Sequence, residues 1–203
     1  TDRLKENLND ERGIKIEEWQ QNRVKITKVE VNAIGEEQVH KKQGTYVTLS
    51  IPTLTSEDRH GFSQMQESLT HYLEELHKEI RITAESKILV VGLGNKTITP
   101  DAIGPYVIDA MHKKQSEHET PEFILYAPGV TAQTGFETSD YVQALTEKIQ
   151  PELVIIVDAL ATSGSARLCR TIQLTNTGIQ PGGGVGNHRK EISKEVLQVP
   201  VSA

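Results

Sequence analysis

The sequence lacks the features that mark disulfide-rich, membrane-spanning and DNA-coating proteins. Its one cysteine, Cys169, has no second thiol for an internal disulfide or a zinc site, and we expect it to be a small buried apolar residue. The longest apolar run falls far short of the ~20 residues that cross a bilayer, so no membrane contact is predicted. With 22 Lys and Arg against 28 Asp and Glu, the formal net charge of −6 disfavours direct binding to nucleic acid.

The N-terminal part of the chain gives little information about function. Residues 1–6 contain no apolar core of a secretory signal, so we expect a cytoplasmic protein. Residues 1–23 are dense in charged and amide side chains and predict an N-terminal arm or a surface helix. The remaining residues, 24–203, are numerous enough for one well-buried core, and we predict a single α/β domain over this range.

Two kinds of periodicity occupy the first half of this range. Residues 24–31 and 45–51 alternate apolar and polar side chains, which is typical of half-exposed strands and predicts a hairpin-like antiparallel flank. Residues 57–80 repeat apolar side chains every three or four positions and predict a long helix.

Strand and helix patterns alternate after residue 87. Short apolar runs at 88–91, 123–126 and 153–157 are separated by helix patterns at about 101–113 and 138–149. Runs of this kind are typical of parallel strands that are buried on both sides. We therefore predict an α/β fold with a mainly parallel sheet, helices on both of its faces and the antiparallel flank described above. Residues 171–175 predict one further strand.

Two aspartates follow buried strands in this pattern. Asp158 comes directly after the run at 153–157, and Asp101 follows the run at 88–91 by one short loop. The carboxyl ends of parallel strands meet at one edge of a sheet, where ligands bind. Two carboxyl groups there can share a proton, so that one activates water as a base while the other protonates the carbonyl or the leaving group. The alternative is that each aspartate only caps a helix or loop.

The loop between the first of these strands and Asp101 does not fit a nucleotide site. Gly92-Leu93-Gly94-Asn95-Lys96-Thr97 has threonine where a dinucleotide fingerprint needs its third glycine. It also has Asn95 between Gly94 and Lys96, which breaks a phosphate-binding loop of the Gly-Lys-Ser/Thr type. We predict no cofactor and no metal.

Several blocks around these aspartates resemble the spore germination protease family. They include Gly-Leu-Gly-Asn, Thr-Pro-Asp-Ala-Ile-Gly-Pro, Val-Asp-Ala-Leu-Ala and Gly-Val-Gly-Asn, and they lie at residues 91–95, 99–105, 127–130, 134–140, 157–161, 175–182 and 184–187. The Gly-x-Gly-Asn motif and the later strand-end aspartate are also similar, more distantly, to the hydrogenase maturation proteases. The resemblance implies the fold of those proteases, a phosphorylase/hydrolase-like α/β fold.

The resemblance also implies an activity. Members of the family are endopeptidases that degrade small acid-soluble, DNA-protecting proteins in the spore core during germination. They are made as zymogens that remove an N-terminal propeptide by self-cleavage, they form tetramers, and they are regarded as atypical aspartic proteases. The two essential aspartates map onto Asp101 and Asp158.

A second set of residues is predicted to shape the cleft, and this prediction comes from their placement in the sequence. The set contains the glycines and asparagines of two loops: Gly92, Gly94, Asn95, Gly182, Gly183, Gly184, Gly186 and Asn187.

Two alternatives to this function remain open. The same aspartates would hold a divalent metal in a maturation-type peptidase, and they would merely cap loops in a catalytically silent relative that acts in binding or assembly. Residues 199–203 have the pattern of a strand cut off midway. That pattern predicts either a truncated protease domain or a shortened relative.

Overall fold

The computed structural model describes residues 13–115, 120–130, 135, 137–162, 164–182 and 189–203. Contacts divide the chain into two compact units. The first unit consists of residues 1–78 and 162–177, and the second of residues 79–161 and 178–203. Each unit is therefore built from segments far apart in the sequence. The single domain predicted for residues 24–203 stays a prediction.

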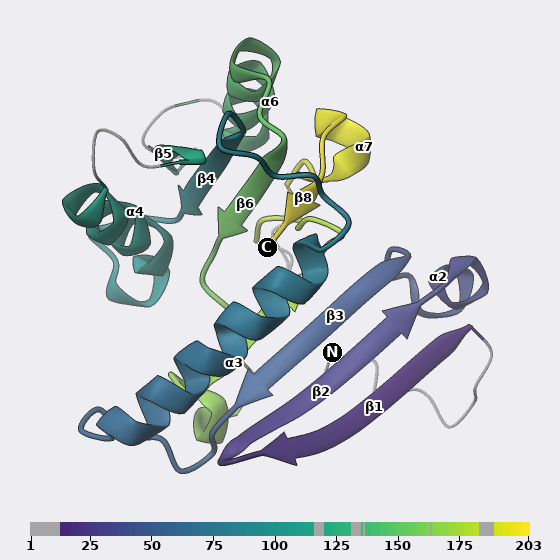
Figure 1. The fold of residues 1–203 in the computed structure, drawn as a ribbon, viewed down its shortest axis with the longest axis vertical. Coiled ribbons are helices and arrows are strands. Elements are labelled where there is room, and N and C mark those ends of the chain that lie inside the picture. Colours follow the sequence, from purple (N-terminus) through teal and green to yellow (C-terminus); the bar gives the residue numbers. More distant parts are fainter. Residues whose placement is uncertain (1–12, 116–119, 131–134, 136, 163, 183–188) are drawn as a thin grey trace. The chain divides into compact units, whose positions relative to one another are not determined.

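An antiparallel sheet forms the first unit (Figure 1). Its strand order is β1-β2-β3-β7, and the strands are β1 (Ile14–Gln21), β2 (Val24–Val31), β3 (Gly44–Ser50) and β7 (Thr171–Thr175). The two alternating segments predicted as strands thus pair with each other, Val29 opposite Tyr46. The strand predicted at 171–175 joins the same sheet by pairing with β3.

One long helix covers one face of this sheet. Helix α3 (Arg59–His77) contacts β2, β3 and β7 and lies along the sheet in Figure 1. Strand periodicity directs Ile26 and Leu49 toward the helix, where they are buried with Met65 and Tyr72. The predicted helix at 57–80 is confirmed, with Asp58 as its N-cap.

Parts of the first unit differ from expectation. Residues 14–21 form a strand, not an arm or a surface helix, because Ile14 packs with Val29 and Val31 on one face while Trp19 meets Tyr72 on the other. Residues 1–12 lie outside the described residues. The short helix α2 (Ala33–Val39) was not expected.

The expected burial of Cys169 is wrong. The residue is exposed, in the turn between the 3-10 helix η2 (Ser165–Arg167) and β7. Its backbone has a positive φ of 57°, which is a turn conformation and not that of a core strand or helix.

The second unit contains the predicted parallel sheet. Its strand order is β5-β4-β6-β8, with β4 (Lys87–Leu93), β5 (Glu122–Gly129), β6 (Leu153–Val157) and β8 (Val201–Ser202). All of its strand pairs are parallel. Both faces are buried, which explains why the strands are continuous apolar runs in the sequence.

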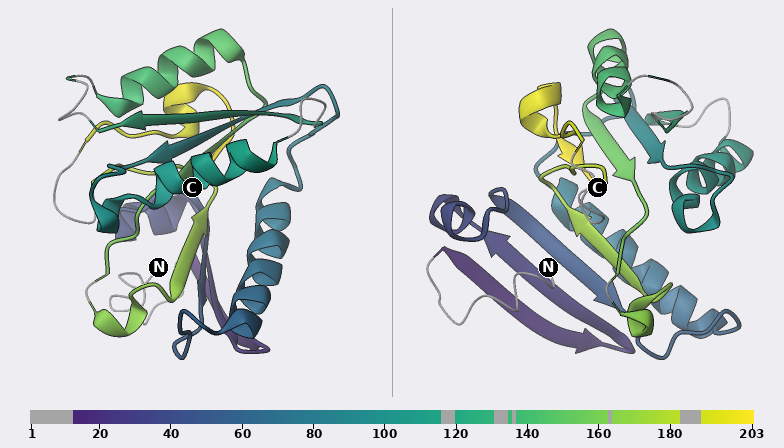
Figure 2. Two further views of the ribbon diagram at one scale, coloured as in Figure 1. Left: turned by 90° about the vertical axis from the view of Figure 1, so that its left-hand side faces the viewer. Right: turned by 180° about the vertical axis from the view of Figure 1, so that it is seen from behind.

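Helices lie on both faces of the parallel sheet, as predicted. The left view of Figure 2 shows the sheet edge-on between α4 (Ile103–Lys114) and α6 (Thr138–Ile149). Ile108 of α4 packs on Ile88 and Val90, whereas Val142 of α6 packs on the opposite face. The short helix α7 (Lys194–Leu197) contacts α6. Within the described ranges, no helix is long and apolar enough to cross a membrane.

Helix α4 begins in close contact with the ends of two strands. A Cβ atom on Gly104, in its first turn, would collide with the carbonyl oxygen of Leu93 and lie 2.6 Å from that of Val157. Gly92 faces the same contact, since a Cβ there would collide with the Gly104 carbonyl oxygen. Both obstructing groups are backbone atoms of packed elements, so the helix start is fixed on the carboxyl ends of β4 and β6.

Replacing Gly104 with alanine should therefore destabilise the protein. In an unobstructed helix, alanine is favoured over glycine by about 1 kcal/mol. Overpacking typically costs about 1–3 kcal/mol, and a clash with backbone atoms of packed elements lies at the upper end of that range and outweighs the gain. We expect Gly104→Ala to lower the free energy of unfolding in urea denaturation, whereas Gly164→Ala, which has open space around its Cβ, serves as the control. An equal, small effect of both substitutions would contradict the packing described here.

Candidate active site

The two predicted aspartates lie at the same edge of the parallel sheet. Strands β4 and β6 are direct neighbours, and Gly92 is in register with Val157. Asp158 follows β6 immediately, and Asp101 is the last residue of the 3-10 helix η1 (Thr99–Asp101), which connects β4 to α4. The close contact at Gly104 holds this connection against both strand ends. The fold thus brings together two acids that are 57 positions apart in the sequence.

The backbone of its own loop holds the Asp101 side chain. The Asn95 N–H donates a hydrogen bond of 2.8 Å to Asp101 Oδ2, and the Asp101 N–H donates one of 2.8 Å to the Ile98 carbonyl. Gly94 has a φ of +117°, and a Cβ there would collide with the Asp101 carbonyl oxygen. A glycine is therefore required at position 94, both for its conformation and for the close approach of the chain.

Asn95 stabilises the loop a second time through its side chain. Its Oδ1 atom accepts hydrogen bonds from the Thr97 N–H at 3.0 Å and from the Thr97 hydroxyl at 2.8 Å. Its carbonyl accepts a further bond from the Ile98 N–H at 3.0 Å. This is an Asx-type turn, which favours a single loop conformation.

Asp158 is half-buried, and its electrostatic surroundings oppose its ionisation. Burial raises the pKa of its carboxyl group, and the negative charge of Asp101 raises that pKa further. The hydrogen bond of 2.8 Å from the Ala159 N–H to Asp158 Oδ1 and the positive charge of Arg189 act in the opposite direction. Asp101 is therefore close enough for its charge to act on the carboxyl group of Asp158.

Part of the predicted cleft-shaping set lies near this edge. Gly92 is buried within β4, and Gly94 and Asn95 form the loop that holds Asp101. Gly182 is half-buried with a φ of +73°. The other members, Gly183, Gly184, Gly186 and Asn187, lie outside the described residues. The cleft-shaping role of the set stays a prediction.

The segment that contains these glycines is held at its base. Ile179 and Ile192 form a bridge with two hydrogen bonds of 2.9 Å, and the Gln180 side chain donates to the Arg189 carbonyl at 3.2 Å. The bridge fixes the points from which the glycine segment leaves and to which it returns. Arg189, whose positive charge lowers the pKa of Asp158, precedes Ile192 of this bridge in the sequence.

Exposed apolar side chains accompany the aspartates, and sequence reasoning missed them. Half of the large hydrophobic side chains found exposed in the described chain lie on the two segments that carry Asp101 and Asp158. They are Ile98, Ile103, Tyr106 and Leu160, each about half exposed, at 48–52%. Ile103 and Tyr106 occupy outward positions of α4, and an apolar residue on the polar face of a helix is the signal that could have found them.

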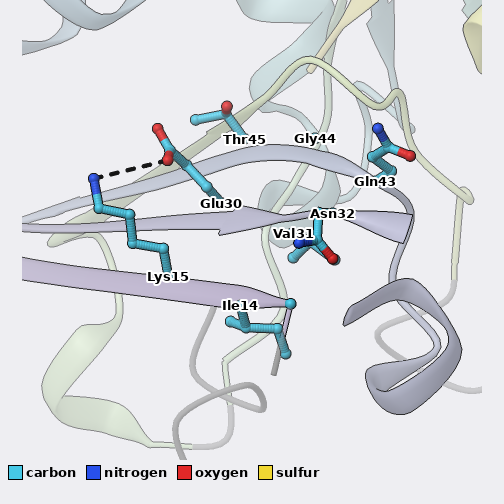
Figure 3. Close-up of a pocket in the computed structure, with 9 residues that line it drawn as sticks. Ile14, Lys15, Glu30, Val31, Asn32, Gln43, Gly44 and Thr45 are labelled. Atoms are coloured by element: carbon cyan, nitrogen blue, oxygen red, sulfur yellow. Dashed lines mark ion pairs between the residues drawn. The ribbon is translucent and has the colours of Figure 1, made fainter. Parts of the chain in front are cut away.

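The pocket drawn in Figure 3 belongs to the first unit and contains neither aspartate. It has a volume of about 410 Å³ and is wide open. Lys15 and Glu30, whose charged groups are 3.9 Å apart, lie at its rim with Asn32, Gln43 and Thr45. This lining contains no pair of carboxyl groups, so the chemistry of the chain points to the strand ends of the second unit.

The aspartate pair is suited to acid–base chemistry on a water molecule. Two carboxyl groups, one with a raised pKa, can hold a water molecule and exchange protons with it. Among the described side chains, no three His, Cys, Asp or Glu residues gather in a group that could hold a metal ion.

Comparison with known proteins identifies the family. A family model described as germination protease matches residues 1–203. The germination protease of Oceanobacillus iheyensis is 40% identical over 214 residues, which cover 100% of this chain and 58% of that protein. Those of Bacillus thuringiensis subsp. konkukian and Bacillus cereus are each 38% identical, and cover 98% and 94% of this chain and 58% and 54% of the relatives. The chain thus spans little more than half the length of these relatives.

A search of solved structures also finds a hydrogenase maturation protease from Thermococcus kodakarensis. It is 19% identical in sequence and has a TM-score of 0.39, with 64% of this chain and 76% of that chain covered. A score this low supports no argument about site or function. The family model matches the whole chain, and this chain therefore belongs to the germination protease family.

Proposed function

We propose that the chain carries the hydrolytic site of an endopeptidase that degrades small acid-soluble, DNA-protecting spore proteins during germination. The observation that carries the proposal is the pairing of Asp101 and Asp158 at one sheet edge, where burial and the charge of Asp101 both raise the pKa of Asp158. Membership of the germination protease family supports both the peptidase activity and the setting of spore germination.

The two carboxyl groups divide the proton transfers between them. One carboxyl group acts as the base and takes a proton from water, the resulting hydroxide attacks the peptide carbonyl, and the other carboxyl group protonates the carbonyl oxygen. When the tetrahedral intermediate breaks down, the amine takes the proton held by the first carboxyl group as the C–N bond breaks, and one hydroxyl of the intermediate returns its proton to the second.

Assembly and processing follow the family in this proposal. The protein is made as a zymogen that removes its own N-terminal propeptide, it forms a homotetramer, and it acts in the spore core without a metal or other cofactor. The residues predicted to shape the cleft keep that role in this proposal: Gly92, Gly94, Asn95, Gly182, Gly183, Gly184, Gly186 and Asn187.

Removing either carboxyl group should abolish cleavage. We expect Asp101→Asn and Asp158→Asn each to lower kcat by at least about 10³-fold, because an amide can neither accept the proton from water nor deliver one. Each substitution is made in the natural protein, the variant is mixed with a purified small acid-soluble spore protein, and cleavage of that spore protein is measured by mass spectrometry. The control is Glu147→Gln, an acid-to-amide substitution at an exposed position of α6, which should retain full activity.

The same assay separates the alternatives. Retained cleavage by either variant would remove that aspartate from the mechanism. Loss of activity in a chelator, restored by a divalent metal, would favour a metal-dependent peptidase. A folded protein that cleaves no spore protein under any of these conditions would be a binding or assembly relative.

The raised pKa of Asp158 also predicts a dependence of stability on pH. A carboxyl group whose pKa is higher in the folded than in the unfolded protein destabilises the folded protein when it ionises. The cost is complete above the folded-state pKa and disappears as the pH falls toward the unfolded value of about 4. Asp158→Asn should therefore raise the free energy of unfolding at pH 7, by about 1.4 kcal/mol for each pH unit of pKa elevation.

Urea denaturation at pH 7 and at pH 3.5 measures this gain. We expect the gain at pH 7 and little or none at pH 3.5, because Asp158 is then protonated in both states. A variant that is less stable than the parent at pH 7, or equally stabilised at both pH values, would show that ionisation of Asp158 does not destabilise the folded protein.

A further inference from the structure

An ion pair links the loop before Asp101 to helix α4. The Lys96 ammonium group bonds to Asp109 Oδ2 and lies 6.0 Å from the centre of the Tyr106 ring. Lys96 is in the middle of the loop, between Asn95 and the Thr97 turn, whereas Asp109 and Tyr106 belong to the first two turns of α4. The ion pair therefore connects the middle of the loop to helix α4, two segments that the chain itself joins at Asp101.

The loop is fixed at both ends. At one end Gly94 is pressed against the Asp101 carbonyl oxygen, and at the other Asp101 itself continues into α4. Between them, the Thr97 N–H and hydroxyl donate to Asn95 Oδ1 and the Ile98 N–H donates to the Asn95 carbonyl, all within the loop. The Lys96–Asp109 pair ties the centre of the loop to helix α4.

The Lys96–Asp109 ion pair contributes more to the position of the loop than to the stability of the protein. Lys96 and Asp109 are 54% and 41% exposed, and ion pairs this exposed add little to the free energy of unfolding. The neighbouring residue, Asn95, nevertheless donates the hydrogen bond that holds Asp101 Oδ2. A shift of the Lys96 backbone moves the Asn95 N–H, and with it the Asp101 carboxylate.

We propose that Lys96 and Asp109 are positioning residues, which hold the Asn95 N–H and thereby the Asp101 carboxylate in the geometry needed to activate water. The inference rests on the proposed role of Asp101 in hydrolysis. Lys96 acts through Asp109 and the loop backbone and does not contact the substrate. Tyr106 limits where the ammonium group can lie, because its ring attracts the cation from the neighbouring turn.

The kinetic test compares substitutions that break the tie with one that keeps it. In the natural protein, Lys96→Met and Asp109→Asn should each lower kcat about tenfold with KM unchanged, since small misplacements of a reacting group cost rate and not ground-state binding. The double variant should be no slower than either single one, because both changes break the same bond. Lys96→Arg should retain most of the activity, and Lys148→Met, on exposed α6, should retain all of it.

Several kinetic results would overturn the proposal. A rise in KM alone would mean that Lys96 contacts the substrate. An inactive Lys96→Met protein beside a fully active Asp109→Asn protein would mean that Lys96 acts independently of Asp109. Full activity of both single variants would mean that the Lys96–Asp109 pair does not position the Asp101 carboxylate.

A second readout does not depend on catalysis. In Lys96→Met and Asp109→Asn, the Asn95 amide should exchange its hydrogen at least about fivefold faster, with its NMR signal displaced, because its bond to Asp101 opens more often. Lys148→Met should leave that amide unchanged, and the melting temperature of all variants should stay within about 2 °C of the parent. An Asn95 amide unaffected by loss of the pair would overturn the inference. If Asp101→Asn kept its activity, the proposed function would fail while this amide measurement still decided whether the pair positions the loop.

Discussion

The second unit holds two carboxyl groups at one edge of a sheet although burial and mutual repulsion both oppose the charge on Asp158. Such an arrangement costs stability, and it persists only where the surrounding backbone fixes it. Here the backbone does so through glycines. Gly92 and Gly104 let α4 start directly on the ends of β4 and β6, and Gly94 lets the chain pass against Asp101. The acid pair is therefore a consequence of close backbone packing.

The same reasoning explains what the sequence could predict. The parallel strands are continuous apolar runs because both faces of the sheet are covered, and that pattern is visible without a structure. Since the ends of neighbouring parallel strands meet at one edge, Asp101 and Asp158 could be paired from their positions alone. The long helix α3 was equally clear, because its apolar positions form one regular stripe along nineteen residues.

Other features depend on contacts that no local pattern contains. Strand β1 is rich in charged and amide residues, and it forms because Ile14 and Trp19 find partners on β2 and α3. Cys169 is exposed because its backbone makes a turn. Lys96 and Asp109 are 13 positions apart, and their pairing follows from the path of the loop over α4. The apolar residues Ile98 and Leu160 become informative only when their exposure is known.

The central claim is that the charges of Asp101 and Asp158 interact at this edge, and a carboxyl-carbon NMR titration tests it most directly. The pKa of Asp158 should lie above the usual range for aspartate, and it should fall when Asp101 is replaced by asparagine, without reaching the usual value, because burial is the larger cause. An Asp158 pKa that does not change when the Asp101 charge is removed would contradict the account.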